Sequence, residues 1–333
     1  MSAVESGIAA PHDANAETLY ELLVLQARYE AVGIISLVLV DPEGRELAPW
    51  QPGSHIDVIL RSGLVRQYSL CGDLDDVASY RIAVLLEPDS RGGSKEIHES
   101  GLVGRTLTVR GPRNHFHLEP AENYLFLAGG IGVTPIVPML QRATADGVPW
   151  RLVYGGRNRK TMGFLEHLES LKGGSVELVP EDELGFPDFE RLLNEAPVGV
   201  GVYGCGPAGM LAALEEHCAR LRPGALHIER FTAPEPEATN EPGINSEFEV
   251  ELRRTGTILT VPADTSLLGA IRQVLPHVLY ACEEGYCGTC ETRVLEGIPD
   301  HRDVILTDAE KARNDTMLIC VGRSCTPRLV LDL

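Results

Sequence analysis

The first pattern along the chain is a set of short apolar runs between residues 19 and 118, separated by Gly, Pro and Asp. The runs are rich in β-branched residues and predict strands at 34–40, 55–60, 81–86 and 106–109. Short strands at even spacing are typical of an antiparallel barrel. We therefore expect residues 17–119 to form an antiparallel β-barrel domain.

A second pattern follows, in which apolar strands alternate with amphipathic helical segments up to residue 231. Each predicted strand precedes its helix, at 125–128 and 135–145, 151–154 and 161–171, 175–179 and 186–193, and 200–203 and 208–221. Such alternation is typical of βαβ units on a parallel sheet. We expect an α/β parallel-sheet domain over 120–232.

The segment 233–245 is rich in Pro and Glu and has no hydrophobic periodicity, which predicts an exposed linker. Residues 1–16 are expected to be a disordered tail. Beyond the linker we predict strands at 247–253 and 258–261, a short helix at 266–274, a cysteine-rich loop and a last strand at 329–333. These elements predict a small third domain over 246–333.

The formal net charge of −19 argues against a nucleic-acid partner, because phosphate binding requires a basic patch. An acidic surface could steer docking to a basic protein, or could simply keep the chain soluble. No run approaches the roughly 20 apolar residues that span a bilayer. The beginning of the chain lacks the pattern of a signal peptide. We therefore expect a cytoplasmic protein that does not engage a membrane.

The cysteines are concentrated in the predicted third domain. Cys282, Cys287 and Cys290 follow the pattern C-x4-C-x2-C, and Cys320 lies thirty residues further on. This is the ligand spacing of a plant-type [2Fe–2S] ferredoxin. The strand–strand–helix–loop order also fits a ferredoxin of the α+β, β-grasp type. The four cysteines are predicted to hold a [2Fe–2S] cluster.

A zinc site is the competing interpretation of this loop. It would pair Cys287 and Cys290 with Cys320 and Cys325, as in a zinc ribbon. It would leave Cys282 unused and would not explain two glycines inside the loop, which allow a close approach of backbone N–H groups to sulfur. The spacing favours iron and sulfur, with Cys325 as a packing residue.

Two glycine-rich turns follow strands of the predicted α/β domain, Gly-Gly-Ile-Gly-Val-Thr-Pro at 129–135 and Gly-Cys-Gly-Pro at 204–207. Such turns bring backbone N–H groups and a helix N-terminus to a pyrophosphate. They also lie at the sheet edge where α/β folds bind ligands. Each could be an ordinary tight turn, and Cys205 could simply pack in the core. Together they predict a nicotinamide-nucleotide site.

The predicted barrel carries Arg-Gln-Tyr-Ser-Leu at 66–70 and Arg-Gly-Gly-Ser at 91–94. An arginine and a glycine-rich turn can hold a phosphate through charge and backbone N–H groups. Tyr68 could stack on a planar ring, and Ser69 could form a hydrogen bond with the ring's edge. Each feature alone is equally typical of a core tyrosine or a plain turn.

In this order, these four motifs and the cysteine spacing resemble the phthalate dioxygenase reductase family, of which vanillate demethylase reductases are close relatives. The resemblance covers nearly everything after the first twenty or so residues. It implies a three-domain protein, with an FMN-binding barrel, an NAD-binding α/β domain and a [2Fe–2S] ferredoxin domain.

The resemblance also implies roles for individual residues. Those expected to bind flavin are Arg66, Tyr68, Ser69, Leu70, Arg91, Gly92, Gly93, Ser94 and Phe231. Those expected to bind the nicotinamide nucleotide are Gly129, Gly130, Gly132, Thr134, Arg157, Cys205, Gly206 and Pro207. Four of these are expected to lie at the site of hydride transfer and are the candidate catalytic residues: Ser69, Thr134, Cys205 and Phe231. Phe231 would cover the flavin ring and yield to nicotinamide.

Nucleotide preference is not settled by the residues. An acidic residue about 20 positions after the first glycine turn would indicate NAD. The chain instead has Arg157, Arg159 and Lys160 in this region, which could accept the 2′-phosphate of NADPH. Arg157 could equally be a surface charge. The family favours NADH.

The predicted function is that of an oxidoreductase, the reductase component of a multicomponent oxygenase. It would carry electrons from NADH through FMN and the cluster to a terminal oxygenase, expected to be a Rieske non-haem iron protein. A flavin must lie between the two other groups because nicotinamide gives a hydride whereas the cluster takes single electrons. The alternatives are an NADH diaphorase or oxidase with a structural cluster, a reductase for a haem monooxygenase, and a non-catalytic redox sensor.

Overall fold

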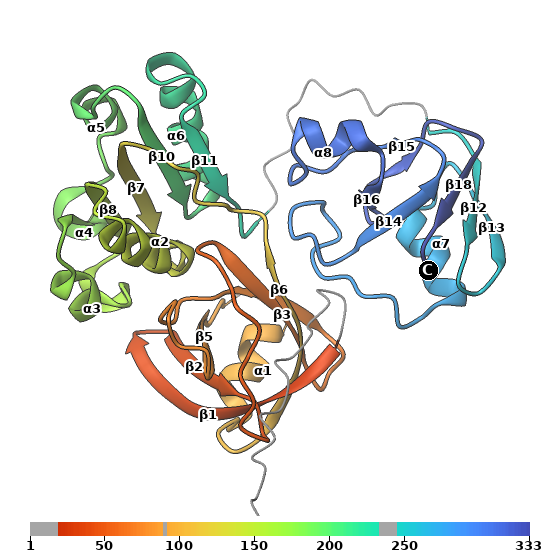
Figure 1. Cartoon of the computed structure of the whole chain (residues 1–333), viewed down its shortest axis with the longest axis horizontal. Coiled ribbons are helices and arrows are strands. Elements are labelled where there is room, and N and C mark those ends of the chain that lie inside the picture. The colour runs from red at the N-terminus through yellow and green to blue at the C-terminus, as the bar shows by residue number, and fades with distance from the viewer. Residues whose placement is uncertain (1–18, 89–91, 233–244) are drawn as a thin grey trace, which may run out of the picture. The chain divides into compact units, whose positions relative to one another are not determined.

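The computed structural model describes residues 19–88, 92–232 and 245–333 (Figure 1). The predicted tail at 1–16 and nearly all of the predicted linker lie outside these residues. The chain divides into two compact units, Met1–Glu229 and Arg230–Leu333.

The first unit begins with a six-stranded antiparallel sheet in the order β4-β3-β6-β1-β2-β5. Its strands are β1 (Leu19–Ala31), β2 (Ile34–Val40), β3 (Ser54–Ile59), β4 (Val65–Ser69), β5 (Ser79–Leu85) and β6 (Thr106–Asn114), with α1 (Gly93–Glu99) between the last two. A bridge between Leu70 and Ile82 joins the two edges of the sheet. The predicted antiparallel barrel is therefore confirmed.

Alternation along the strands decides which side chains fill the barrel. Ile56 and Val58 of β3 lie in its apolar core with residues of β1, β2 and β5. Because successive side chains of a strand point to opposite faces, His55 points to the other face. His55 is paired with Ser69 of β4 in the antiparallel register, so both side chains lie on that face.

The rest of the first unit is a five-stranded parallel sheet in the order β11-β10-β7-β8-β9, which confirms the predicted α/β parallel-sheet fold. Its strands are β7 (Asn123–Gly129), β8 (Trp150–Gly156), β9 (Gly174–Pro180), β10 (Val200–Cys205) and β11 (Leu226–Glu229); its helices are α2 (Val133–Ala145), α3 (Leu165–Ser170), α4 (Glu181–Leu184), α5 (Phe189–Glu195) and α6 (Ala208–Leu221). Alternate residues of β7 pack against α2 on one face and against α5 and α6 on the other. All five strands end at one edge, where both glycine-rich turns therefore lie.

Two helices differ from their predicted limits because of local caps. The segment expected to be helical over 161–171 becomes helical only at Leu165, because Phe164 adopts a left-handed backbone with φ of 64°. The next predicted helix begins at Phe189 instead of 186, where the side chain of Asp188 accepts the N–H of Arg191 at 3.0 Å.

The barrel and the parallel sheet pack together within the first unit. The N–H of Val32, in the turn between β1 and β2, donates to the carbonyl of Lys160 at 2.9 Å. The Arg81 guanidinium lies 5.2 Å from the centre of the Phe164 ring. Residues of both parts share one apolar core. This packing brings the end of β4 close to the ends of β10 and β11.

The second unit contains a five-stranded mixed sheet in the order β13-β12-β18-β14-β16 and a small ladder of β15 with β17. Its elements are β12 (Phe248–Leu252), β13 (Thr257–Val261), α7 (Leu267–Val274), β14 (Glu291–Glu296), β15 (Pro299–Asp300), α8 (Asp308–Arg313), β16 (Thr316–Leu318), β17 (Arg323–Ser324) and β18 (Arg328–Leu331). Helix α7 packs its apolar face on the sheet. The predicted ferredoxin-type α+β domain is confirmed.

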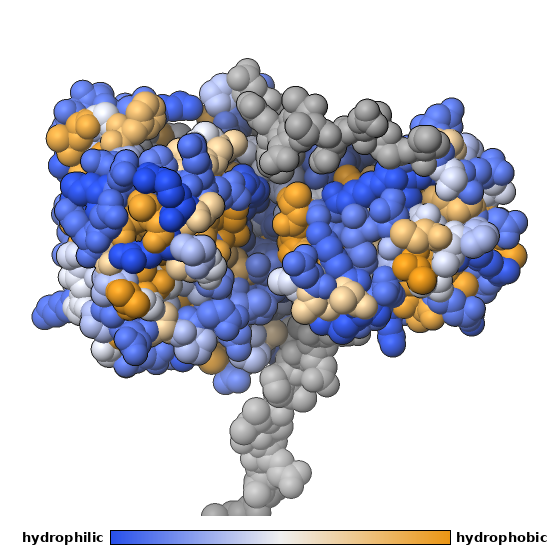
Figure 2. Space-filling model, turned by 90° about the horizontal axis from the view of Figure 1, so that it is seen from above, coloured by the Kyte–Doolittle hydropathy of each residue, from blue (hydrophilic) through white to orange (hydrophobic). Residues whose placement is uncertain are grey.

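On the face shown in Figure 2, small apolar patches lie within a mainly hydrophilic surface. Isolated exposed apolar side chains are normal for folded proteins and need no further explanation. Within the described residues, no helix has both the length and the apolar character needed to cross a membrane.

Candidate functional site

The four predicted cluster cysteines converge in the second unit, and all are buried. The thiols of Cys287 and Cys320 donate to the sulfur of Cys282, and these hydrogen bonds lower the pKa of Cys282. The same contacts raise the pKa of Cys287 and of Cys320. Cys320 also contacts Cys290. The fold therefore brings the distant fourth cysteine to the loop that carries the other three.

Backbone N–H groups of the loop point at its sulfurs. The N–H groups of Glu284 and Tyr286 donate to Cys282, the first at 3.3 Å. Gly285 and Gly288 have φ values of 76° and 71°, a left-handed conformation that glycine adopts readily. Amide donors around buried thiolates stabilise the negative charge of an iron–sulfur cluster. The donor set fits the [2Fe–2S] group.

The zinc interpretation requires Cys325, which is exposed and whose thiol faces the carbonyl of Pro299 at 3.8 Å. Among the described residues, no three His, Cys, Asp or Glu side chains surround a single point as ligands of one metal ion do. The sulfurs of the four cluster cysteines instead contact one another in series, Cys287 with Cys282, Cys282 with Cys320 and Cys320 with Cys290. This set includes Cys282 and leaves out Cys325, as the iron–sulfur interpretation requires.

In the barrel, Arg66 lies directly over the turn that precedes α1. A Cβ placed on Gly93 would fall 2.5 Å from Nε of Arg66, so only glycine allows this approach. Gly92 has a φ of 96°, and the hydroxyl of Ser94 accepts the N–H of Glu87 at 3.2 Å. A guanidinium beside a glycine-rich turn suits the phosphate of a flavin. Arg91 lies outside the described residues.

The end of β4 meets the ends of β10 and β11 at a small polar cluster. The hydroxyl of Ser69 donates to Oε2 of Glu229 at 3.4 Å. Cys205 is fully buried, and it is paired with Glu229 in the parallel register. Burial raises the pKa of the Glu229 carboxyl to about 8. Burial, assisted by Glu229, raises the pKa of the Cys205 thiol. Both groups are therefore uncharged at neutral pH.

Glu229 was not among the predicted site residues. Glu229 lies in the segment His-Ile-Glu-Arg-Phe at 227–231. It ends a strand at the same sheet edge as Cys205, and this position could have indicated a site residue. The strand over 226–229 was not predicted, so the Glu229 carboxylate was not expected at this edge of the sheet. A perturbed pKa at the carboxyl edge of an α/β sheet is typical of a functional residue.

His55 was also missed. It is 2% exposed and neither of its ring nitrogens has a hydrogen-bond partner in the described part of the chain. Its ring stacks on His115 with centroids 5.6 Å apart. Burial, and then the charge of Arg113, lowers its pKa well below 6.5. A neutral imidazole with unsatisfied nitrogens beside Ser69 fits a site completed by a bound cofactor.

The two glycine-rich turns of the parallel sheet touch each other. A Cβ on Gly132 would fall 2.3 Å from the carbonyl oxygen of Cys205, and one on Gly129 would fall 2.6 Å from Cδ of Pro207. A Cβ on Gly206 would fall 3.0 Å from Cα of Gly129. The structure thus brings the two predicted nucleotide-binding turns together at the carboxyl edge.

The remaining predicted residues lie in varied surroundings. The hydroxyl of buried Thr134 donates to the carbonyl of Ile131 at 2.9 Å, so it supports the first glycine turn. Leu70 lies in the barrel core. Tyr68 is partly buried against the same core. Arg157 is exposed, and Phe231 is 37% exposed.

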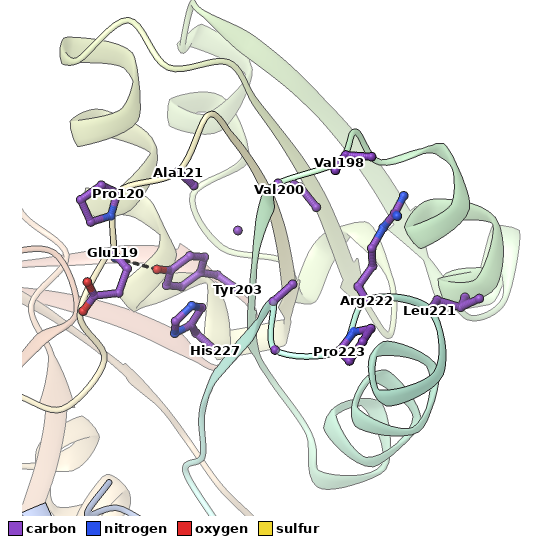
Figure 3. Close-up of a pocket in the computed structure, with 14 residues that line it drawn as sticks. Glu119, Pro120, Ala121, Val198, Val200, Tyr203, Leu221, Arg222, Pro223 and His227 are labelled. Atoms are coloured by element: carbon purple, nitrogen blue, oxygen red, sulfur yellow. Dashed lines mark hydrogen bonds between the residues drawn. The ribbon is translucent and has the colours of Figure 1, made fainter. Parts of the chain in front are cut away.

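A cavity of about 460 Å³ lies at the opposite edge of the parallel sheet (Figure 3). It is lined by Glu119, Val200 and His227, and the His227 ring stacks on Tyr203 with centroids 4.6 Å apart. The N–H of Glu119 donates to the Tyr203 hydroxyl at 2.7 Å. Because α/β sheets bind nucleotides at the carboxyl ends of their strands, this cavity is not the nicotinamide site.

Comparison with known proteins agrees with this geometry. The family model described as 2Fe-2S iron-sulfur cluster binding domain matches residues 250–325. A phenoxybenzoate dioxygenase subunit beta of Ectopseudomonas oleovorans is 42% identical over 92% of this chain and 94% of its own. A vanillate O-demethylase oxidoreductase of Pseudomonas sp. (strain HR199 / DSM 7063) is 39% identical over 95% of this chain and 100% of its own.

Two solved structures extend the comparison. Phthalate dioxygenase reductase, described as a modular structure for electron transfer from pyridine nucleotides to [2Fe–2S], is 32% identical over 95% of this chain and 98% of its own, with a TM-score of 0.67. An intact type IV self-sufficient cytochrome P450 monooxygenase is 41% identical over 95% of this chain, with a TM-score of 0.84. The chain spans 41% of that longer protein.

Fold and site together define a flavin- and iron–sulfur-containing oxidoreductase that uses a nicotinamide nucleotide. The chain belongs to the phthalate dioxygenase reductase family. The predicted function, an electron-transferring reductase component of a multicomponent oxygenase, is confirmed at the level of the family, as is the predicted cofactor set of FMN, NADH and a [2Fe–2S] cluster.

Proposed function

We propose that this chain takes electrons from NADH at the junction of Ser69, Cys205 and Glu229 and delivers them singly to a cytoplasmic Rieske-type oxygenase. The observation that carries the proposal is the contact between Ser69 and Glu229 at 3.4 Å, because it joins the barrel strand of the flavin motif to the nucleotide-binding edge of the sheet. The flavin accepts two electrons as a hydride and releases them one at a time, which is the chemistry it supplies when bound.

The barrel residues hold and orient the flavin. Arg66 and the turn of Gly92, Gly93 and Ser94 bind its phosphate, the guanidinium supplying charge and the turn supplying N–H groups. Tyr68, Ser69 and the backbone of Leu70 line its ring system. Arg91 is assigned to the phosphate as well, and Phe231 to the cover over the ring.

The two glycine turns bind the nucleotide. Gly129, Gly130 and Gly132 let backbone N–H groups approach the pyrophosphate, and Thr134 holds the first turn through its bond to Ile131. Gly206 and Pro207 close the second turn, beside Cys205. Their direct contact supports a nicotinamide position near the Ser69–Glu229 pair. An uncharged Glu229 and Cys205 favour the arrival of a hydride, because a buried negative charge would oppose it.

NADH is the proposed nucleotide. The basic segment that includes Arg157 and Arg159 lies against the acidic helix α4. The N–H of Asp182 donates to the carbonyl of Arg157 at 3.2 Å, and Nε of Arg159 lies 3.5 Å from a carboxylate oxygen of Glu183. A 2′-phosphate here would meet the carboxylates that already offset this basic charge.

The four cysteines hold the cluster. Cys282, Cys287, Cys290 and Cys320 would ligate its iron atoms, and the contacts among their sulfurs support this set. The Glu284 and Tyr286 N–H groups then stabilise the additional negative charge of the reduced state.

An anaerobic titration of the purified holoprotein with NADH tests the proposal. Both the flavin and the iron–sulfur absorbance bands should bleach, with about three electrons accepted per protein, since flavin takes two and the cluster one. Bleaching of a flavin band with no iron–sulfur band would instead support a diaphorase.

A second candidate acceptor is a haem monooxygenase. It is favoured by the 41% identity to a part of the self-sufficient P450. Stopped-flow mixing of NADH-reduced protein with a Rieske oxygenase and with a P450 haem domain compares the two. Faster reduction of the haem domain would overturn the Rieske assignment.

A further inference from the structure

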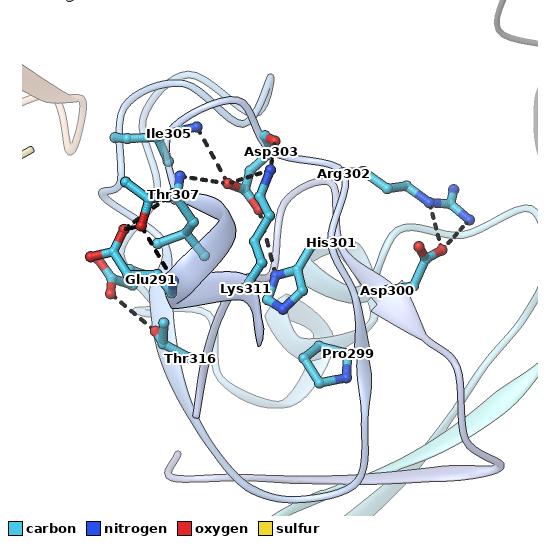
Figure 4. A network of polar contacts seen from close by, with 12 residues as sticks. Glu291, Pro299, Asp300, His301, Arg302, Asp303, Ile305, Thr307, Lys311 and Thr316 are labelled. Atoms are coloured by element: carbon cyan, nitrogen blue, oxygen red, sulfur yellow. Dashed lines mark hydrogen bonds and ion pairs between the residues drawn. The ribbon is translucent and has the colours of Figure 1, made fainter. Parts of the chain in front are cut away.

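A buried acidic residue, Asp303, lies next to the cluster loop and has no part in the assignments above. It is 5% exposed. Oδ2 of its carboxylate accepts the N–H of Leu306 at 2.8 Å and that of Ile305 at 3.3 Å (Figure 4). Two amide donors therefore fix the carboxylate, and the carboxylate in turn fixes the turn that follows it.

Charged and titratable groups face Asp303 from two sides. Nζ of Lys311, on α8, donates to the Asp303 carbonyl at 2.8 Å and lies 3.8 Å from Oδ2. Nδ1 of His301 lies 3.7 Å from Oδ1. A buried ion pair adds little to stability compared with apolar residues of similar volume. We therefore ask which part of the chain the ion pair of Asp303 and Lys311 holds in position.

The turn held by Asp303 rests on the cluster loop. The N–H of Val304 donates to the carbonyl of Gly285 at 3.2 Å. A Cβ on Gly285 would fall 3.2 Å from Cα of Asp303 and 2.8 Å from a methyl group of Val321. Gly285 is thus clamped between the Asp303 turn and the segment after the fourth cysteine.

Gly285 stands between the two residues whose N–H groups point at Cys282. Glu284 precedes it and Tyr286 follows it, and both donate to that sulfur. The position of the Gly285 peptide therefore decides how well these donors are aimed. Donors aimed at a ligand sulfur stabilise the reduced cluster and raise its reduction potential.

We propose that Asp303 is a positioning residue for the iron–sulfur cluster: through Val304 it holds Gly285, and so sets the cluster's reduction potential. The inference rests on the proposed assignment of the four cysteines as ligands. The proposed effect comes from the carboxylate of Asp303 as a hydrogen-bond acceptor. The negative charge of Asp303 is matched by the positive charge of Lys311.

Two double variants separate positioning from charge. Asp303→Asn with Lys311→Met removes both charges and keeps an oxygen that accepts the N–H groups of Ile305 and Leu306. Asp303→Ala with Lys311→Met removes the same charges and the acceptor. Redox titration of the full-length holoprotein with mediator dyes, followed by visible absorbance and EPR, gives the cluster potential of each.

The Asn variant should keep a potential close to the unmodified protein. The cluster potential of the Ala variant should be lower. Its one-electron equilibrium with a reference dye should shift about tenfold, which corresponds to 59 mV. Asp300→Asn, which breaks the partly exposed pair with Arg302 at 2.7 Å, is the matched control and should leave the potential unchanged.

Equal shifts in both double variants would show that charge alone acts, and an unchanged potential in the Ala variant at full iron and sulfide content would show a purely structural role. Either result overturns the inference. If the Ala variant does not retain a cluster, Asp303→Ser in the same Lys311→Met background replaces it and should give a potential between the other two. Absence of iron–sulfur bands in the unmodified protein would instead contradict the ligand assignment.

Discussion

The hydroxyl of Ser69 donates to the carboxyl of Glu229 across 3.4 Å, and these two residues are 160 positions apart in the chain. One belongs to the barrel and the other to the last strand of the parallel sheet. The contact places a carboxyl group whose pKa is raised to about 8 by burial at the meeting point of the flavin and nucleotide motifs. Its protonation then becomes part of how the site works.

The first prediction concerns pH. Glu229 keeps its proton below pH about 8 and carries a charge above it. The rate of flavin reduction by NADH should therefore fall as pH rises through this value, by about tenfold per pH unit once the charged form dominates. Glu229→Gln should show no fall in this window. Anaerobic rapid mixing between pH 6 and 10 measures both, and the same fall in the variant would contradict the role of Glu229.

The raised pKa also predicts how stability depends on pH. In the unfolded chain this carboxyl loses its proton near its ordinary value of 4.5, whereas the folded protein retains it up to about 8. The folded state binds more protons between these values, so the free energy of unfolding should decrease from pH 4.5 to 8 and then level off. Glu229→Gln should lose less stability between pH 5 and 8, as measured by thermal unfolding.

The second prediction concerns the flavin phosphate. Gly93→Ala would place a Cβ 2.5 Å from Nε of Arg66 and displace the guanidinium. Loss of one charge-assisted hydrogen bond should weaken FMN binding by roughly tenfold or more. Equilibrium dialysis of the apoprotein measures this. Gly209→Ala is the control, because a Cβ there meets nothing within 4 Å and the variant should bind FMN normally.

The third prediction concerns nucleotide preference. Glu183→Gln frees Arg159 from its ion pair and should raise kcat/KM for NADPH while leaving NADH little affected. The gain should be about fivefold, since an exposed pair contributes up to about 1 kcal/mol. Glu190→Gln breaks a similarly exposed pair with Arg220 at 3.2 Å and should change neither value. An equal change of kcat/KM in both variants would show that the acidic helix α4 does not set nucleotide preference.

The fourth prediction separates the two halves of the electron path. Cys287→Ser should abolish electron delivery to a one-electron protein acceptor and leave reduction of the flavin by NADH intact. Cys325→Ser should change neither, because this thiol is exposed and lies outside the group of four. Absorbance spectra and stopped-flow traces with NADH alone distinguish the two steps. Equal loss of both in Cys287→Ser would show that the cluster also supports the flavin site.

Local sequence patterns were sufficient to predict the fold of each of the three domains and the cluster ligands. Short β-rich runs at even spacing predicted the antiparallel barrel, and the alternation of strands with helical segments predicted the parallel sheet, because both patterns can be read along the chain. The ligand spacing around Cys287 predicted the [2Fe–2S] site, because three of its four ligands come from one loop. Helix limits were less accurate, since caps at Asp188 and Phe164 moved them.

Only the tertiary structure decided which distant groups share an environment. The pKa of Glu229 depends on burial at the junction with Ser69, and no spacing along the chain encodes that burial. The same holds for the turn at Asp303. Its residue Val304 donates a hydrogen bond to Gly285, and 18 residues lie between these two positions in the chain. The sequence by itself determined the class of each domain and the cluster chemistry. The packing of those elements decided the charge states and donor directions, because desolvation and hydrogen-bond geometry arise only when the chain is folded.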